Sequence, residues 1–334
     1  TLDLGKDSSK AIGMDTTDIL NPSSLKKVIF KTKQYDLKDG DIDVQGDSYK
    51  VVYNNESYII GEQGTKRSYI TSKTSSLHQI CAYTAITRYL EPNTTDNEVN
   101  IVLACPVSVL KTDEAKEKYK ELIRGNGVIN IEVNDISYGF TINDITLKAE
   151  SSGIIYLEPA LFKNQKVLVV DFGGLNMTVT LFTDKVCAIP DTDRFLEEHG
   201  SIALYNIASE KLTAYRDGNF VDAKDAELAL NRGYLLDYGK KDLKSIEVLE
   251  SAKQKYFNKA CDLIAQHGIQ FRDLDKIIFI GGTSNYLKDQ ISQLGNGFIT
   301  DNSQIMIKST KVADATLQRR KQLLLANQKV LKEK

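Results

Sequence analysis

The sequence predicts an α/β protein built from two similar domains, and three observations support this. Strand-like and helix-like stretches alternate along its 334 residues, which favours packed layers of sheet and helix. A chain of this length holds roughly two domains of about 150 residues each. An Asp-x-Gly loop that follows a strand occurs twice, at Asp3 and at Asp171, half a chain apart. The repeat predicts two related mixed-sheet domains that face each other across a cleft.

Composition and charge argue against several classes of protein. The chain is 41% hydrophobic and 26% charged, and its net charge of −2 gives no bulk attraction to nucleic acid or to an acidic membrane. Four cysteines without CxxC spacing indicate free thiols in a reducing cytoplasm. No apolar run reaches the roughly 18 residues of a membrane span, and no signal-peptide pattern is present. The strand at Thr1 looks cut short, so we expect residues upstream of it.

The first half is predicted to be rich in strands. Paired asparagines between two alternating stretches indicate a hairpin at 48–60, and apolar residues at helical spacing predict a helix at 74–90. Strands are expected at 1–5, 9–14, 28–33, 48–53, 56–60, 99–104, 128–133, 138–142 and 144–149, and helices at 74–90, 113–124 and 151–162.

The second half repeats this scheme with longer helices. Strands are expected at 167–170, 178–182 and 276–280, and helices at 199–215, 223–232, 242–266 and 287–294, followed by a basic, helix-prone tail. The first domain is expected to span 1–155, with a C-terminal helix at about 312–334 returning to it. The second is expected to span 156–311, with a smaller subdomain at about 190–240.

The two Asp-x-Gly loops have a chemistry that suits a metal-bound polyphosphate. Each alone is an ordinary turn, because aspartate starts turns and glycine supplies positive φ. As a pair, Asp3 and Asp171 offer the oxygen ligands that Mg²⁺ prefers. Gly5 and Gly173 let backbone N–H groups approach phosphate oxygens, and Lys10 would add a positive charge. The pair therefore predicts a nucleotide site.

A third glycine element follows the strand at 276–280, in the order Gly281-Gly282-Thr283-Ser284. It is either a tight turn into a helix or a bare backbone surface on which a purine or ribose lies. It matches neither the GxGxxG pattern nor the lysine-bearing P-loop, so neither of those folds is supported.

Glu150 stands between a predicted strand and a predicted helix. It is either a first-turn glutamate favoured by the helix dipole or a carboxylate that orients water for attack on a γ-phosphate. Glu158 competes for the second role, and the residues alone do not separate the two.

Together these segments resemble the actin-like ATPase superfamily, and most closely the ParM-type actins of bacterial plasmid segregation. The resemblance rests on the strand and proline turn at 99–106, on Phe140-Thr141-Ile142-Asn143-Asp144 leading to Glu150-Ser151, on Asp171-Phe172-Gly173-Gly174 and on Ile280-Gly281-Gly282. It extends from Leu2 to about Leu294.

The resemblance implies a two-domain actin-like fold that binds ATP or ADP with Mg²⁺ in the cleft. Asp3 and Asp171 would hold the magnesium hydration shell, and Lys10 matches the phosphate-binding lysine. Glu150 matches the water-orienting glutamate, which selects it over Glu158. The implied nucleotide-binding residues are Asp3, Gly5, Lys6, Lys10, Asp171, Gly173, Gly174, Asn176, Gly281, Gly282, Thr283 and Ser284.

Two departures from the family pattern stand out. Relatives often carry Thr-Thr and a second acidic residue after the central Gly-Gly, where this chain has Leu175-Asn176-Met177-Thr178. Magnesium binding and hydrolysis are therefore less securely implied than ATP binding. The segment at 312–315 lacks an expected glycine, so the C-terminal region is expected to pack in its own way.

The implied function is that of a cytoplasmic, filament-forming ATPase. Subunits would assemble head to tail, and nucleotide state would change the contacts between them. The partner would be a small DNA-binding adaptor on a centromere-like plasmid site, with no direct contact to nucleic acid and no membrane. One alternative is a non-filamentous actin-fold ATPase or phosphotransferase. Another is a membrane-associated morphogenetic actin that binds through its basic C-terminal helix.

Overall fold

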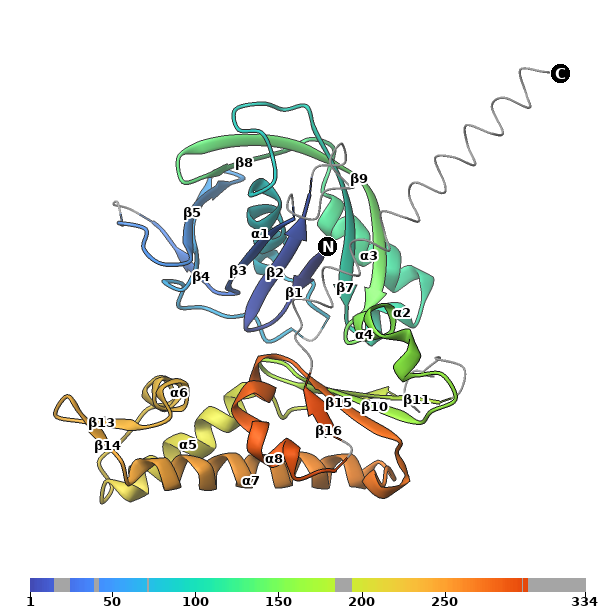
Figure 1. The fold of residues 1–334 in the computed structure, drawn as a ribbon. Helices are drawn as coiled ribbons and strands as arrows, with labels where there is room; N and C mark the ends of the chain where they lie inside the picture. Colours follow the sequence, from blue (N-terminus) through green and yellow to red (C-terminus); the bar gives the residue numbers. More distant parts are fainter. Residues whose placement is uncertain (15–24, 39–41, 71, 184–193, 296, 300–334) are drawn as a thin grey trace. The chain divides into compact units, whose positions relative to one another are not determined.

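A computed structural model describes the chain except for residues 15–24, 39–41, 71, 184–193, 296 and 300–334 (Figure 1). The chain divides into two compact units, with the boundary in the sequence between Leu157 and Glu158. We call the described residues up to Leu157 unit 1 and those from Glu158 onward unit 2. The helix expected at 312–334 lies outside the described residues, as do residues 190–193 of the expected smaller subdomain.

Unit 1 is a nine-stranded sheet in the order β3-β2-β1-β7-β9-β8-β5-β6-β4. Its strands are β1 (Leu2–Leu4), β2 (Ser8–Gly13), β3 (Lys26–Lys31), β4 (Gln34–Asp36), β5 (Ser48–Tyr53), β6 (Glu56–Gly61), β7 (Asn97–Cys105), β8 (Ile129–Val133) and β9 (Ile136–Ala149). Its helices are α1 (Ser76–Thr87), α2 (Val107–Leu110), α3 (Asp113–Arg124) and α4 (Gly153–Leu157). The sheet curves around α1, which is buried on nearly all sides, so this helix forms the centre of the core (Figure 1).

Unit 2 is a five-stranded sheet in the order β12-β11-β10-β15-β16, with a separate two-stranded hairpin β13–β14. The strands are β10 (Val167–Phe172), β11 (Met177–Phe182), β12 (Arg194–Glu197), β13 (Leu235–Asp237), β14 (Lys240–Asp242), β15 (Lys276–Ile280) and β16 (Gly297–Ile299). The α-helices are α5 (Ser201–Tyr215), α6 (Ala223–Arg232), α7 (Ser245–Gln266) and α8 (Lys288–Ser292), and the 3₁₀ turns are η3 (Pro159–Leu161), η4 (Phe271–Asp273) and η5 (Gly282–Leu287). The core forms where α5, α6 and α7 pack with β10, β11 and β15.

The two sheets share one five-strand arrangement. Strands β3-β2-β1-β7-β9 of unit 1 have the same order and sense as β12-β11-β10-β15-β16 of unit 2. In both series the first two pairings are antiparallel and the last two are parallel. The prediction of two similar α/β domains, made from the repeated loop, is therefore confirmed.

Several predicted elements are confirmed, and two are wrong for identifiable reasons. The bounds of α3, α6 and β15 agree with those predicted, and β5 and β6 form the predicted hairpin. The strands predicted at 138–142 and 144–149 are one continuous strand of 14 residues, because a bulge at Asn143 absorbs the polar residue without ending the strand. The helix predicted at 151–162 is only α4 followed by η3, because Pro159 disfavours helical backbone at Glu158, whose φ is −132°.

Candidate functional site

The two predicted loops are structurally equivalent hairpin turns. In β1–β2, Asp3 lies directly opposite Lys10, and in β10–β11, Asp171 lies directly opposite Thr178. We call residues 5–8 the first loop and residues 173–176 the central loop. The equivalence places a carboxylate at the same point of each sheet, but opposite an ammonium group in unit 1 and a hydroxyl in unit 2.

Each turn has glycine at its first position, where a side chain would be crowded. A Cβ at Gly5 would lie 2.5 Å from the carbonyl oxygen of Ser8, and one at Gly173 would lie 3.0 Å from that of Asn176. The Gly173 amide donates a hydrogen bond of 2.9 Å to the same Asn176 oxygen, which closes the central loop. A side chain is therefore excluded at Gly5 and crowded at Gly173, so both turns carry bare backbone at this position.

The carboxylates of unit 1 are joined by two lysines into a chain of ion pairs. Lys10 Nζ lies 3.5 Å from Asp3 Oδ2, and Lys73 Nζ lies 3.7 Å from Asp3 Oδ1. Lys73 Nζ also lies 2.5 Å from Glu150 Oε1. Unit 1 therefore brings Asp3, Lys10 and Glu150 together as predicted, through a lysine that the sequence analysis did not single out.

The strand register places Glu150 beside this cluster. Asp3 of β1 is aligned with Ala104 of β7, and Ala104 with Lys148 of β9, all in parallel pairings. Glu150 follows directly after β9, and its amide donates to the carbonyl of Cys105 at 3.0 Å. Three adjacent strands thus deliver their side chains to one edge of the sheet, as α/β sheets commonly do at their ligand sites.

The charges in this cluster stabilise one another. Burial raises the pKa of the Asp3 carboxyl, but the neighbouring Lys10 and Lys73 ammonium groups outweigh it and hold the pKa below its ordinary value. Burial lowers the pKa of Lys73, but Glu150 and Asp3 outweigh it and raise this pKa. Asp3 is therefore ionised and Lys73 protonated at neutral pH.

The nearby histidine of α1 is neutral. His78 is fully buried, and its Nδ1 lies 2.7 Å from the Ser75 hydroxyl. Burial, together with the positive charges of Lys73 and Lys6, lowers the pKa of His78 to about 4. The positive charge of this region therefore comes from its lysines, including Lys6 of the first loop, which is 9% exposed.

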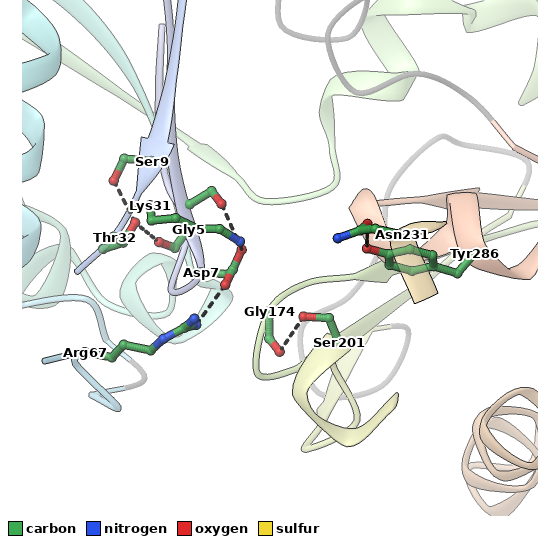
Figure 2. A network of polar contacts seen from close by, with 11 residues as sticks. Gly5, Asp7, Ser9, Lys31, Thr32, Arg67, Gly174, Ser201, Asn231 and Tyr286 are labelled. Carbon is green, nitrogen blue, oxygen red and sulfur yellow. Dashed lines mark hydrogen bonds and ion pairs between the residues drawn. The ribbon is translucent and has the colours of Figure 1, made fainter. Parts of the chain in front are cut away.

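The first loop is held by a second set of charges centred on Asp7 (Figure 2). Lys31 Nζ donates to Asp7 Oδ2 at 2.9 Å, and Arg67 donates to Oδ1 at 2.8 Å. The Thr32 hydroxyl donates to the Gly5 carbonyl at 2.6 Å, and the Thr32 amide to the Asp7 carbonyl at 2.9 Å. Burial raises the pKa of Asp7, but Lys31 and Arg67 outweigh it and lower the pKa to about 2. The first loop is thus fixed on β3 and on the segment after β6.

The central loop is held instead by the N-terminus of α5. The amides of Ser201 and Ile202 donate to the carbonyls of Gly173 and Gly174 at 2.9 and 3.1 Å. The Ser201 hydroxyl also donates to the Gly174 carbonyl, at 3.3 Å (Figure 2). Gly200 is needed here because a Cβ would lie 2.5 Å from the Gly174 oxygen. These bonds turn the loop's carbonyl groups toward α5.

The third glycine element lies against the end of β10, directly before the central loop. Asp171 is aligned with Ile280 in the parallel pairing of β10 and β15. Gly281 has φ of +90°, and a Cβ there would lie 2.8 Å from Asp171 Oδ1 and closer still to the Phe172 carbonyl. The Ser284 hydroxyl donates to the Gly281 carbonyl at 2.6 Å, so it closes the turn.

Unit 2 therefore brings together the residues predicted for it. Its cluster contains Asp171, Gly173, Gly174, Asn176, Gly281, Gly282, Thr283 and Ser284. Thr283 and Ser284 are buried, at 2% and 1% exposure, whereas Glu158 is exposed and directly precedes η3. In the described part of the chain, no helix is long and apolar enough to cross a membrane.

Comparison with known proteins agrees with this architecture. Residues 1–153 match the family of actin like proteins, N terminal domain. The protein of the Alp12 filament structure is 44% identical, with 94% of this chain and 98% of that chain covered and a TM-score of 0.66. No match was found among curated proteins.

Two more distant structures share the fold. The archaeal actin homologue Ta0583, in complex with ADP, is 16% identical over 95% of this chain and 98% of its own, with a TM-score of 0.70. The protein of a 15-stranded ParM filament from Clostridium botulinum is 18% identical over 93% and 98%, with a TM-score of 0.65. The repeated sheets and paired loops thus define an actin-like fold. With its similarity to Alp12 over almost the whole chain, the protein belongs to the actin-like protein family.

The ion pairs of Asp7 are expected to contribute to stability in a pH-dependent way. Because its pKa falls from 3.8 to about 2 on folding, Asp7→Asn should lower the free energy of unfolding by about 2 kcal/mol at pH 7. The contribution of a carboxylate with a lowered pKa is complete above the unfolded value. The gap between wild type and variant should therefore persist at pH 5 and narrow as the pH falls from 4 toward 2. Urea unfolding at each pH measures it.

A matched control is Asp113→Asn, which removes an exposed carboxylate that also pairs with a lysine, at 2.8 Å. This variant should unfold almost as the wild type does. An equal loss for both variants, or a gap for Asp7→Asn that does not change with pH, would contradict the role given to Asp7.

Gly281→Ala is expected to distort the third glycine element, because the positive φ and the closeness of Asp171 leave no room for a Cβ. A loss of roughly 1–3 kcal/mol in the free energy of unfolding is expected from the backbone strain alone. The neighbouring Gly282→Ala is the control, because a Cβ at Gly282 meets nothing within 4 Å. Urea unfolding should separate the two alanine variants, and equal stabilities would refute the steric argument.

Proposed function

We propose that this protein is a nucleotide-dependent, filament-forming cytoplasmic ATPase that drives plasmid DNA segregation through a DNA-bound adaptor. The observation that carries the proposal is the 44% identity, over 94% of the chain, to a protein whose structure is described as the Alp12 filament. The site residues support nucleotide binding and hydrolysis, and the similarity to this relative supports filament assembly.

Binding of ATP and ADP is supported by the charge around Asp3 and the first loop. Five cationic side chains outnumber three carboxylates there, so the region has an excess of positive charge that suits phosphate groups. The cations are Lys6, Lys10, Lys31, Arg67 and Lys73, and the carboxylates are Asp3, Asp7 and Glu150. The first loop would offer its backbone N–H groups to phosphate oxygens beside these charges, and the equivalent turn of unit 2 would offer the same kind of donor. The ADP complex of the archaeal actin homologue supports the same assignment.

The donor set also fits a magnesium ion. Asp3 is held in its ionised form, and Mg²⁺ is bound in proteins by one or two carboxylates together with waters and phosphates. Asp3 and Asp171 would hold its hydration shell. The ion would neutralise charge on the phosphates. The central hairpin has Leu175-Asn176-Met177-Thr178 where the family pattern has Thr-Thr and an acidic residue.

Hydrolysis is assigned to Glu150 acting on a water molecule. A carboxylate accepts a hydrogen bond from the water and turns the water's oxygen toward the γ-phosphorus. The bond between the γ-phosphorus and the bridging oxygen breaks as the new oxygen–phosphorus bond forms, giving ADP and inorganic phosphate. Lys10 offsets negative charge on the phosphates during this step.

Assembly follows from a head-to-tail contact between copies of the chain, which continues without closing and so gives a filament. Nucleotide state would bias the conformation that makes this contact. The net charge of −2 gives no drive for direct DNA binding, so a small DNA-binding adaptor on a centromere-like site would provide the link.

Addition of ATP and Mg²⁺ is expected to raise light scattering of the purified protein, with filaments visible in negative stain. Phosphate release should accompany assembly. Glu150→Ala should slow phosphate release at least tenfold and leave filaments intact, because it removes the water-orienting group and not the nucleotide-binding loops. Glu158→Ala, in an exposed turn of unit 2, is the control and should behave as wild type.

Absence of filaments at a protein concentration of several micromolar would refute the filament proposal. Unchanged phosphate release in Glu150→Ala would remove Glu150 from its role, whether or not filaments form.

Plasmid segregation is tested in cells by the retention of a low-copy plasmid that carries this gene with its neighbouring sequences. Replacing the gene with the Glu150→Ala form should raise plasmid loss per generation, because filaments that do not hydrolyse nucleotide do not turn over. Equal retention with and without the gene would refute the segregation role.

A further inference from the structure

Lys73 is a buried lysine to which the proposed reaction assigns no role. It is 5% exposed, and its ammonium group lies 2.5 Å from Glu150 Oε1 and 3.7 Å from Asp3 Oδ1. It therefore contacts both the residue assigned to water and a residue assigned to magnesium. Lysine is rarely buried unless paired, because its desolvation is costly.

The surrounding structure fixes the position of this lysine. Its backbone has φ of +57°, a left-handed conformation that non-glycine residues seldom adopt and that only strong local constraints maintain. The next helix, α1, begins three residues later, and its first turn is tied back by the contact between Ser75 and His78. Lys73 therefore reaches the carboxylates from a constrained loop.

The ion pair limits what the Glu150 side chain can do. A glutamate after the end of a strand has several rotamers, and a single ammonium contact at Oε1 selects among them. The same ammonium offsets the repulsion between the Asp3 and Glu150 carboxylates. Lys73 is thus placed between the residue assigned to magnesium and the residue assigned to the water.

We infer that Lys73 is a positioning residue for hydrolysis, which holds Glu150 by its Oε1 atom so that Oε2 is presented to the water. This inference rests on the proposed ATPase function. Lys73 would affect the rate of hydrolysis through the orientation of Glu150 and not through the binding of nucleotide.

The test is a double-mutant cycle on Lys73→Met and Glu150→Gln, measured as phosphate release at saturating ATP. Each single variant should slow release at least tenfold. The double variant should be no slower than Glu150→Gln alone, because Lys73 acts through the group already removed. Lys73→Arg should recover part of the rate by restoring the charge. The dissociation constant of a fluorescent ATP analogue should change less than threefold in Lys73→Met.

A second measurement needs no nucleotide. Lys73→Met should lower the urea midpoint of the nucleotide-free chain, because it leaves the buried Oε1 atom of Glu150 without its counter-ion. Adding Glu150→Gln should restore part of that midpoint. Lys253→Met is the matched control, because Lys253 pairs with Glu250 at 2.7 Å in α7, with its side chain 13% exposed. Phosphate release by this control should equal that of wild type.

Three results would overturn the inference. The first is a double variant whose loss of rate is the product of the losses in the two single variants. The second is an unchanged rate of phosphate release in Lys73→Met. The third is tenfold weaker binding of the ATP analogue to Lys73→Met with ADP binding preserved. The last would make Lys73 a phosphate ligand. If the wild type itself releases no phosphate, the ATPase proposal fails. If Lys73→Met releases phosphate as fast as an active wild type, only the inference about Lys73 is refuted.

Discussion

One steric constraint sets the arrangement of both units, namely the tight turn between two antiparallel strands. A Cβ at Gly5 would lie 2.5 Å from a carbonyl oxygen and is excluded, and one at Gly173 would lie 3.0 Å from the equivalent oxygen and is crowded. Such a turn brings its strands into register at once, so the aspartate two residues earlier has a fixed partner across the hairpin. The parallel strands β7 and β15 then place Glu150 and Gly281 relative to those aspartates.

The two turns are equivalent in backbone but differ in how they are held. The first loop depends on charged side chains, with Asp7 bound by Lys31 and Arg67. The central loop depends on the backbone of α5, whose first amides bind the loop carbonyls. Thr178 stands where the first hairpin has Lys10. Unit 1 therefore concentrates charge suited to phosphates, and unit 2 provides mainly backbone and one carboxylate.

Elements set by neighbouring residues could be predicted from the sequence, whereas contacts between residues far apart in the sequence could not. Helix α3 was predicted as a polar helix because Gly125 follows its end, and the structure adds that the Thr112 side chain caps its start. Lys73 and Arg67 were missed because no local pattern links them to Asp3 or Asp7, from which they are far apart in sequence. The β13–β14 hairpin was missed for a different reason: Tyr238 occupies a positive-φ turn position where asparagine or glycine is the usual signal.

The ion chain of unit 1 joins charged side chains from three segments of the unit. Asp3 lies in β1, Lys73 in the loop before α1, and Glu150 after β9. A positive charge placed near Asp3 competes with Lys73 for that carboxylate, and electrostatic interactions at such short range in a buried site are strong. Since Lys73 also binds Glu150, such competition changes the balance of forces on Glu150 as well. Charge at one end of the cluster is thereby coupled to the orientation of the group at the other end, through a single buried ammonium.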